Sequence, residues 1–316
     1  MTILKRFSPY IFFLMLGIFI ALLYNFYSNK NTNNTSDIPT STITRTAKNS
    51  GTNYFISSKD KNLKLENLTI TNNSVDFILN IENFDNLNID NNIITVFVNN
   101  VQVYFDFNDK INNKKYEFAI KPNSNCFNLK INNLNVNKKE NDLLIIISKK
   151  CSNYDMTSSY EERQSNSTNF FNLKLFNYNS KNNGDSKKEY QHLDSEKDIK
   201  MNNGIYLNQW LNNNKKDINP FIKSKTNQKI DIPVIIKNDS KYNESNIMLL
   251  VNDEQYKVAN KDYINIKLNN SLAKFIFLCV EAPNQKGNYN IKVAMKCKNK
   301  GNQIYFISNT IKLIVE

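Results

Sequence analysis

Val75-Asp-Phe-Ile-Leu-Asn-Ile81 carries an apolar side chain at every second position along one side of an extended chain. The shorter stretches Ile94-Thr-Val-Phe-Val98 and Phe127-Asn-Leu-Lys-Ile131 have the same period of two. This period is typical of a β-strand with one buried face and one solvated face. Long helical periodicity is missing beyond the apolar N-terminal segment, so the sequence predicts an all-β fold for the remainder.

The second half of the chain repeats the pattern of the first half. Val75–Asn83 aligns without gaps on Ile230–Asn238, and Ile94–Gln102 aligns on Ile247–Gln255. Two further matches pair the late strands of the halves, namely Asn141–Cys151 with Gly287–Cys297 and Phe171–Leu175 with Asn309–Leu313. Similar strands in the same order predict one architecture used twice.

Each copy contains roughly seven short strands separated by turns about every 8–15 residues, which favours an antiparallel sandwich over a parallel α/β sheet. Asn and Asp are expected to form the turns, because the chain has only 6 Gly and these residues tolerate left-handed backbone angles. Pro233 lacks a backbone N–H, which predicts that its strand is an edge strand or contains a bulge.

The expected organisation begins with an apolar run that has the length of a membrane-spanning helix. The sequence predicts a cytoplasmic N-terminus at 1–6, a transmembrane anchor at 7–27, a disordered polar tether at 28–50, a first sandwich at 51–178, a polar linker at 179–203 and a second sandwich at 204–316.

The anchor is expected to keep its N-terminus in the cytoplasm, because Lys5 and Arg6 precede the apolar run. Aromatic rings that prefer the headgroup zone lie at both of its ends: Phe7, Tyr10, Tyr24 and Tyr27. A single-pass protein of the cytoplasmic membrane with its C-terminal domains outside the cell is therefore expected. A cleaved signal peptide is the alternative, although no small-x-small site follows Ala21.

The net charge of +12 comes almost entirely from lysine. Arg6, Arg45 and Arg163 are the only arginines, and arginine is the residue that most often reads bases and forks phosphates. Nucleic acid is therefore not an expected partner. The expected partners are the membrane itself and an unidentified protein or an acidic cell-envelope polymer, which diffuse positive charge would attract.

Four cysteines lie beyond the anchor and form two candidate disulfides, Cys126 with Cys151 and Cys279 with Cys297. Free thiols are the alternative. Alternation predicts that Cys297 faces the core, that Cys126 faces outward, and that Cys279 shares an inward face with Phe275 and Phe277.

No catalytic, metal or cofactor site is expected. The chain has no Cys-x-x-Cys, and its single histidine, His192, lies in the polar linker. Three aromatic residues that strand alternation does not explain are candidates for a partner surface: Tyr160, Trp210 and Phe221.

Each copy resembles the immunoglobulin-like modules found in tandem on bacterial extracytoplasmic proteins. The resemblance rests on Val98-Asn-Asn-Val-Gln102 and Val251-Asn-Asp-Glu-Gln255, and on Gly287-Asn-Tyr289 at the start of a late strand. It implies a noncatalytic binding or scaffolding role with specificity in end loops. The alternative is an accessory subunit that assembles in a membrane complex through its helix.

Overall fold

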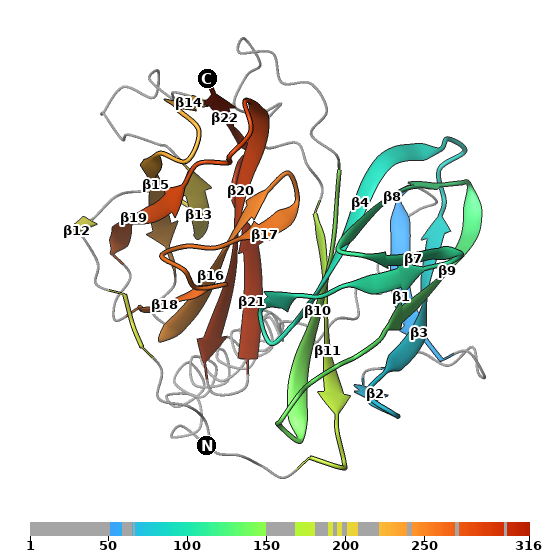
Figure 1. Ribbon diagram of the computed structural model, residues 1–316. Coiled ribbons are helices and arrows are strands. Elements are labelled where there is room, and N and C mark those ends of the chain that lie inside the picture. The colour runs from blue at the N-terminus through green and yellow to red at the C-terminus, as the bar shows by residue number, and fades with distance from the viewer. Residues whose placement is uncertain are drawn as a thin grey trace, which may run out of the picture. The chain divides into compact units, whose positions relative to one another are not determined.

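The computed structural model of the chain describes residues 51–58, 65, 67–149, 168–180, 189–191, 195–197, 201–207, 221–238, 242–268, 272–299 and 302–316. The regular secondary structure of this described part consists of β-strands (Figure 1). The chain divides into the units Met1–Ile43 and Thr44–Glu316, and all described residues belong to the second. The described residues contain no helix long and apolar enough to cross a membrane, and the expected anchor at 7–27 lies outside them.

Residues 51–180 contribute two sheets to a first sandwich. Its strands are β1 (Thr52–Ser57), β2 (Asn67–Thr69), β3 (Val75–Asn83), β4 (Ile89–Val98), β5 (Val101–Gln102), β6 (Phe105–Phe107), β7 (Lys110–Asn113), β8 (Lys115–Ile120), β9 (Asn123–Ile131), β10 (Glu140–Lys149) and β11 (Asn169–Phe176). One sheet has the order β1-β3-β9-β6-β7, and the other has the order β2-β11-β10-β4-β5 with β8 also paired to β4.

A second pair of sheets is formed by residues 195–316. Its strands are β12 (Ser195–Lys197), β13 (Gly204–Leu207), β14 (Phe221–Ser224), β15 (Lys229–Lys237), β16 (Glu244–Val251), β17 (Glu254–Tyr256), β18 (Ile264–Lys267), β19 (Ala273–Glu281), β20 (Gly287–Asn299), β21 (Asn302–Ile307) and β22 (Ile311–Val315). One sheet has the order β12-β19-β15-β13, and the other β14-β22-β20-β16-β17, with β18 on β16 and β21 on β20.

The same pairings recur in both sandwiches. β1–β3–β9 corresponds to β13–β15–β19, and β11–β10–β4 corresponds to β22–β20–β16. In each copy an early short strand lies parallel to the last strand, β2 on β11 and β14 on β22. Early strands divided between two sheets, with the late strands in one of them, give an immunoglobulin-like β-sandwich.

The strand registers correct one of the sequence alignments. Val98 and Val251 are equivalent, and they pair with Leu143 and Ile291 respectively. Asn141 therefore corresponds to Tyr289, not to Gly287, and the expected match of Cys151 with Cys297 is wrong by two residues. Such an error keeps the inward and outward faces, because side chains alternate with a period of two.

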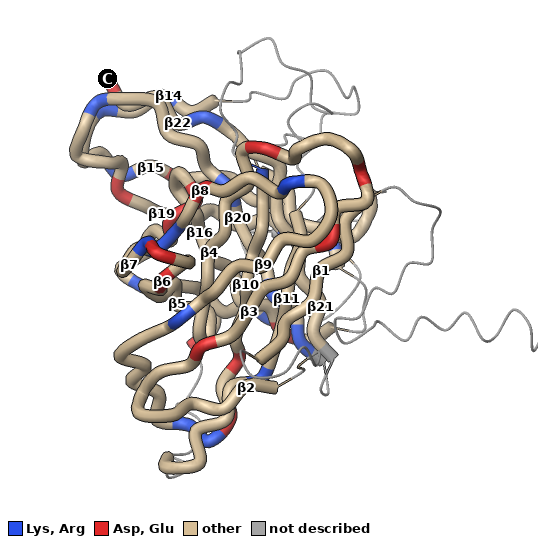
Figure 2. The backbone as a smooth tube through the Cα atoms, turned by 90° about the vertical axis from the view of Figure 1, so that its right-hand side faces the viewer, with Lys and Arg blue, Asp and Glu red and all other residues tan. Residues whose placement is uncertain are grey.

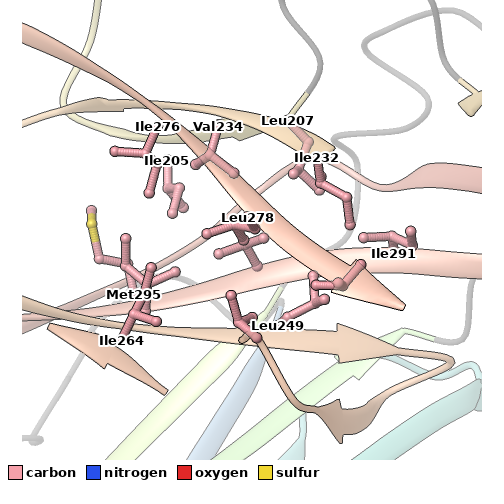
Figure 3. Packing of buried hydrophobic residues seen from close by; sticks show 14 of the residues in the cluster. Ile205, Leu207, Ile232, Val234, Leu249, Ile264, Ile276, Leu278, Ile291 and Met295 are labelled. Atoms are coloured by element: carbon pink, nitrogen blue, oxygen red, sulfur yellow. The ribbon is translucent and has the colours of Figure 1, made fainter. Parts of the chain in front are cut away.

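Two separate hydrophobic cores lie inside the sandwiches. Val75, Phe77, Leu79 and Ile81 point into the first core with exposed fractions of 4% or less, as the alternation predicts. The second core is built by the same faces of β13, β15, β16, β19, β20 and β22 (Figure 3). Burial of these faces is the main favourable contribution to folding of each sandwich.

Asn and Asp form the left-handed turns, as expected. The β4–β5 hairpin turns through Asn99 and Asn100, with φ of 52° and 69°, and the β16–β17 hairpin turns through Asn252 and Asp253, with φ of 51° and 65°. Positive φ at both central residues is the requirement of a type I′ hairpin turn.

Pro233 occupies a position that is an edge only locally. Its strand, β15, lies between β19 and β13, so the strand as a whole is not an edge strand. The described pairing of β15 with β13 ends at Val234. Pro233, the residue next to Val234, has no described partner in β13. The missing N–H therefore removes none of the described ladder hydrogen bonds.

Ala259 has a φ of 47° although it is neither Gly, Asn nor Asp. Its side chain is exposed, so a substitution there loses no packing. We predict that Ala259→Gly raises the free energy of unfolding by about 0.5–1 kcal/mol, because glycine adopts this conformation without steric cost. Urea denaturation measures the change, and a loss of stability would contradict the backbone assignment.

Candidate functional site between the two sandwiches

Apolar residues on the outer faces of both sandwiches pack together. Phe97, Leu144 and Ile146 from the first sandwich form one cluster with Met248, Leu250 and Ala294 from the second, and each is at most 3% exposed. The outer face of an antiparallel sheet is ordinarily solvated. Here the β4–β10 face covers the β16–β20 face, and Phe170 of β11 stacks on Tyr305 of β21 with ring centroids 5.8 Å apart.

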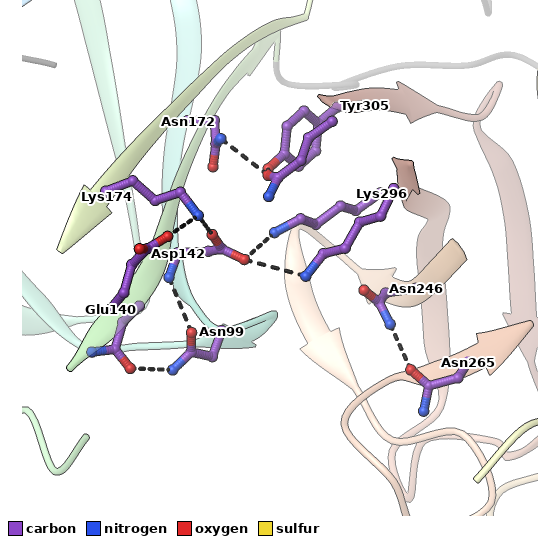
Figure 4. Close-up of polar contacts among 12 residues, drawn as sticks. Asn99, Glu140, Asp142, Asn172, Lys174, Asn246, Asn265, Lys296 and Tyr305 are labelled. Carbon is purple, nitrogen blue, oxygen red and sulfur yellow. Dashed lines mark hydrogen bonds and ion pairs between the residues drawn. The ribbon is translucent and has the colours of Figure 1, made fainter. Parts of the chain in front are cut away.

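A charged network lies beside this apolar contact (Figure 4). The Asp142 carboxylate accepts hydrogen bonds from Lys296 Nζ at 2.5 Å and from Lys174 Nζ at 2.8 Å, and Lys298 Nζ lies 3.4 Å away. Lys174 also pairs with Glu140 at 2.7 Å. Asp142 and Lys174 belong to the first sandwich and the other two lysines to the second, so one carboxylate joins both.

Burial and charge act in opposite directions on Asp142. Burial alone would raise the pKa of Asp142, but the charges of Lys296 and Lys298 and the hydrogen bonds from Lys174 and Lys296 hold it well below its usual range. Burial lowers the pKa of Lys296 to about 8, although Asp142 opposes this shift. The Lys296 side chain is only 1% exposed and shares its one carboxylate with two other lysines.

Two glutamines at equivalent positions bind each other's backbone. Gln102 N donates to Gln255 Oε1, and Gln255 N donates to Gln102 Oε1, both at 2.6 Å. Gln102 Nε2 donates to Asp253 O at 3.2 Å, and Gln255 Nε2 donates to Asn100 O at 2.8 Å. Asn100 and Asp253 are themselves equivalent, so this reciprocal contact has an approximate local two-fold symmetry. We call it the glutamine clasp.

Further polar contacts extend from either side of the glutamine clasp and the apolar cluster. Lys115 Nζ donates to Asn252 O at 2.6 Å and pairs with Glu254 at 3.2 Å. Asn172 Nδ2 donates to Gln303 Oε1 at 3.0 Å. With its apolar centre and hydrogen-bonded margin, the contact has the composition of a stable interface.

We predict that Gln102→Ala and Gln255→Ala each cost about 1–3 kcal/mol of unfolding free energy, because each leaves buried backbone groups of the other hairpin unpaired. The double variant should cost more than either single variant, because each change breaks different side chain–backbone hydrogen bonds of the glutamine clasp. Urea denaturation of the four chains measures the losses. A loss below about 0.5 kcal/mol from both single variants would contradict the glutamine clasp.

Continuous apolar runs in the sequence indicate this interface, although the alternation of side chains did not predict it. Ile94–Val98 was expected to alternate, yet all five of its residues are buried. Leu143-Leu-Ile-Ile-Ile147 and Ile247-Met-Leu-Leu-Val251 are likewise apolar at every position. Continuous apolar runs indicate strands that are buried on both faces. Asp142 and Lys296, 154 residues apart, could not be paired without the strand registers.

The structure places only some of the expected site residues. The anchor residues Lys5, Arg6, Phe7, Tyr10, Tyr24 and Tyr27 lie outside the described residues, as do Cys151, Tyr160 and Trp210. Phe221 begins β14 and is partly buried, where it pairs with Lys312 of β22. Of the three aromatic residues, the described part of the chain contains only Phe221.

Cys126, Cys279 and Cys297 are free thiols. Cys126 is exposed as expected, and Cys297 is buried with its Sγ 3.0 Å from Ser245 Oγ. Burial raises the pKa of the Cys297 thiol to about 11. The expectation for Cys279 is wrong: it is exposed, because Ile276, Leu278 and Val280 take the inward face of β19. Cys279 and Cys297 thus lie on different sheets, one facing solvent and one facing the core, and do not form the candidate disulfide.

A small polar hollow of about 230 Å³ lies where β20 changes partner from β21 to β22. It is lined by Gly204, Lys292 and Asn309, among others. Lys292 is already paired with Asp253 at 2.7 Å, and the Asn309 side chain bonds to the backbone of Leu207. The polar groups of the hollow are therefore engaged in holding strands together.

No protein-family model and no curated protein sequence matches the chain. Among solved structures, the chain is similar to the CARDB domain of a Pyrococcus furiosus protein in complex with di-metal ions, with 16% identity over 31% of this chain and 86% of that one and a TM-score of 0.22. It is also similar to the C-terminal domain of the Streptococcus agalactiae polypeptide BspA, with 7% identity over 84% and 100% and a TM-score of 0.22.

A third similar structure is CfaE, the adhesive subunit of the CFA/I fimbria of enterotoxigenic Escherichia coli, with 11% identity over 86% of this chain and 81% of that one and a TM-score of 0.22. Scores this low carry no functional argument. The strand pairings alone place the described part of the chain among immunoglobulin-like β-sandwich structures.

Proposed function

We propose that the chain is a single-pass, membrane-anchored extracytoplasmic protein with a noncatalytic binding role, in which two tandem immunoglobulin-like sandwiches act as one rigid head. The observation that carries the proposal is the contact through Asp142, the glutamine clasp and the Phe97 cluster. A chain that only needed spacers would gain nothing from fixing the two sandwiches against each other. A binding head gains a surface whose loops keep constant relative positions.

The interface leaves the sandwich ends as the surface for a partner. At the end of the first sandwich where β1 begins, the β3–β4 loop exposes the apolar side chains of Phe84 (53%) and Leu87 (76%). The loop is fixed at its base, because Asn83 Nδ2 donates to Leu87 O and Gly51 N donates to Asp85 Oδ1. Exposed apolar groups on a fixed loop are typical of a protein contact.

The charge distribution favours a shaped site over diffuse attraction. Basic and acidic positions are interspersed along the described chain (Figure 2). Neighbouring opposite charges largely cancel each other's field, and salt screens the remaining field beyond a Debye length of ~8–10 Å. Such a surface attracts an acidic polymer weakly at physiological salt. The proposed partner is therefore a protein, and an acidic cell-envelope polymer is the alternative that the salt dependence tests.

Affinity capture from cell envelopes with residues 44–316, at low and raised salt, tests the proposal. We expect a protein that stays bound at raised salt and is lost from the Phe84→Asp, Leu87→Asp variant. Ile111→Asp, at a side chain 77% exposed on β7, is the matched control and should keep the partner. Complete loss of capture with salt would point to the acidic polymer. A partner insensitive to both changes would contradict a site at the β3–β4 loop.

Two experiments on the full chain test the anchoring. Protease added to spheroplasts should remove both sandwiches and leave an N-terminal stub, whereas protection of the whole chain would overturn the orientation. Replacing residues 7–26 with an unrelated apolar span should leave partner capture unchanged. Loss of the partner with the new span would instead support the accessory subunit that assembles through its helix.

A further inference from the structure

The two sandwiches complete their β3-type sheets in different ways. In the first sandwich, β9 pairs with β6, which is supplied by the chain between Gln102 and β8. In the second, the described chain between Tyr256 and Ile264 forms the isolated bridge of Val258 with Lys261, and Ala259 N donates to Cys279 O of the equivalent strand β19 at 3.1 Å. Nearer its start, at Ala273–Phe275, β19 pairs with β12, which comes from before the second sandwich. This part of the β19 edge is thus covered by the segment that joins the two copies.

The same segment first binds β18 of the other sheet. Tyr190 forms a parallel bridge with Asn265, Gln191 N donates to Asn265 O at 2.8 Å, and Asn265 Nδ2 donates to Glu189 O at 3.1 Å. These hydrogen bonds are made to backbone groups of the segment. They require an extended chain and do not depend on its side chains.

Side chains of the segment add specificity on this edge. Tyr190 Oη donates to Glu244 at 2.5 Å, and Lys267 Nζ lies 4.8 Å from the centre of the tyrosine ring. Glu189 pairs with Lys261. The edge of the second sandwich thus offers a cation and a carboxylate around one aromatic ring, and a second cation for the preceding acidic residue.

Gln191 and β12 also contact the edge of the opposite sheet. Gln191 Nε2 donates to Phe277 O at 3.3 Å, and Ser195–Lys197 pairs antiparallel with Ala273–Phe275. Glu189–Gln191 and β12 therefore cover the edge of β18 and the Ala273–Phe277 part of the edge of β19. Exposed strand edges are the usual sites at which another extended chain adds to a sheet.

We propose that the β18–β19 edge of the second sandwich is a strand-accepting site for an extended peptide in which an acidic residue, a tyrosine and a glutamine follow one another. In the free chain the site is filled by the chain's own residues Glu189–Gln191 and Ser195–Lys197. The described cis ligand is short, since β12 has 3 residues, and its contact of Lys261 with Glu189 is solvent-exposed. Its advantage over a peptide in solution is its high effective concentration, which a disabled segment would lose.

A labelled synthetic peptide of residues 187–200 tests the site by fluorescence anisotropy on chains of residues 44–316. The Tyr190→Ala, Gln191→Pro variant loses the ring, the N–H donated to Asn265 and the side-chain amide. It should bind the peptide at least about tenfold more tightly than the wild-type chain, whose own segment competes. A peptide carrying the same proline should bind at least about tenfold more weakly than the unaltered peptide. Tyr178→Ala, at an exposed tyrosine outside the segment, should behave as wild type.

Equal binding to the variant and the wild-type chain, or binding to neither, would overturn the proposal. If the double variant does not fold, Gln191→Ala removes only the bond to Phe277 O and should still raise peptide affinity severalfold, and no change would again overturn it. A wild-type dimer that the peptide dissociates would show the segment bound to a second copy, and would overturn its assignment as a cis ligand.

Discussion

Asp142→Asn should lower the free energy of unfolding by about 3–5 kcal/mol at neutral pH, because it leaves the buried ammonium group of Lys296 without its carboxylate. The substitution keeps the shape of the side chain, so the loss reports charge and not volume. Urea denaturation measures the change. Asp231→Asn, at an exposed aspartate of β15, is the control and should change stability by less than about 0.5 kcal/mol.

The effect of Asp142→Asn should depend on pH in a defined direction. The folded-state pKa of Asp142 is well below its unfolded value of about 3.9, so the unfolded chain binds the proton first as the pH falls. The stability contributed by Asp142 is therefore complete above about pH 5 and declines below about pH 4. The difference between wild type and Asp142→Asn should shrink accordingly. A difference that stays constant down to about pH 3 would contradict the charge network.

Lys296→Met tests how much the buried lysine itself contributes to the stability of this network. It removes a lysine that is 1% exposed and leaves Asp142 with Lys174 and Lys298. Because burying an ammonium group is costly, its replacement by an apolar side chain of similar length should change stability much less than Asp142→Asn. An equal loss from both variants would mean that Lys296, and not the sharing of one carboxylate, dominates the network.

Phe97→Ala should cost about 3–5 kcal/mol of unfolding free energy, the usual loss for a fully buried aromatic ring. Phe97 is 0% exposed only because residues of the second sandwich cover the outer face of β4. On a free sheet face the same substitution would cost well under about 1.5 kcal/mol. Phe84→Ala, at a ring 53% exposed on the β3–β4 loop, is the matched control and should have little effect.

A small loss from Phe97→Ala would show that the two sandwiches separate in solution. Differential scanning calorimetry gives a second measure. The wild-type chain should unfold in one transition, since the interface couples both cores, whereas a chain with a broken interface should show two.

Much of the architecture was predictable because it depends on local alternation. The faces of β3 and the duplicated hairpins at Asn99–Asn100 and Asn252–Asp253 follow directly from sequence spacing and turn chemistry. β19 was misassigned because Ala273–Glu281 has apolar residues on both faces, so alternation alone could not tell Phe277 from Leu278. Only packing against the opposite sheet makes that choice.

The contacts between the sandwiches were harder to predict because they join residues far apart in the chain. Gln102 and Gln255 were recognised as equivalent, but equivalence does not imply contact. The donated strand β12 lies in a polar segment with no strand-like alternation, and it pairs because β19 presents an edge. Contacts of this kind depend on register and on which edges remain open.

The fixed packing of the two sandwiches can be measured with the chain's own cysteines. Cys126 and Cys279 are exposed, one in each sandwich, while Cys297 is buried with a raised thiol pKa that makes it unreactive. In a Cys151→Ser background, spin labels on the two exposed thiols report the distance between the sandwiches by double electron–electron resonance. A single narrow distance distribution that broadens in the Phe97→Asp variant is the predicted result. A distribution as broad in the wild-type chain as in that variant would contradict a rigid two-sandwich head.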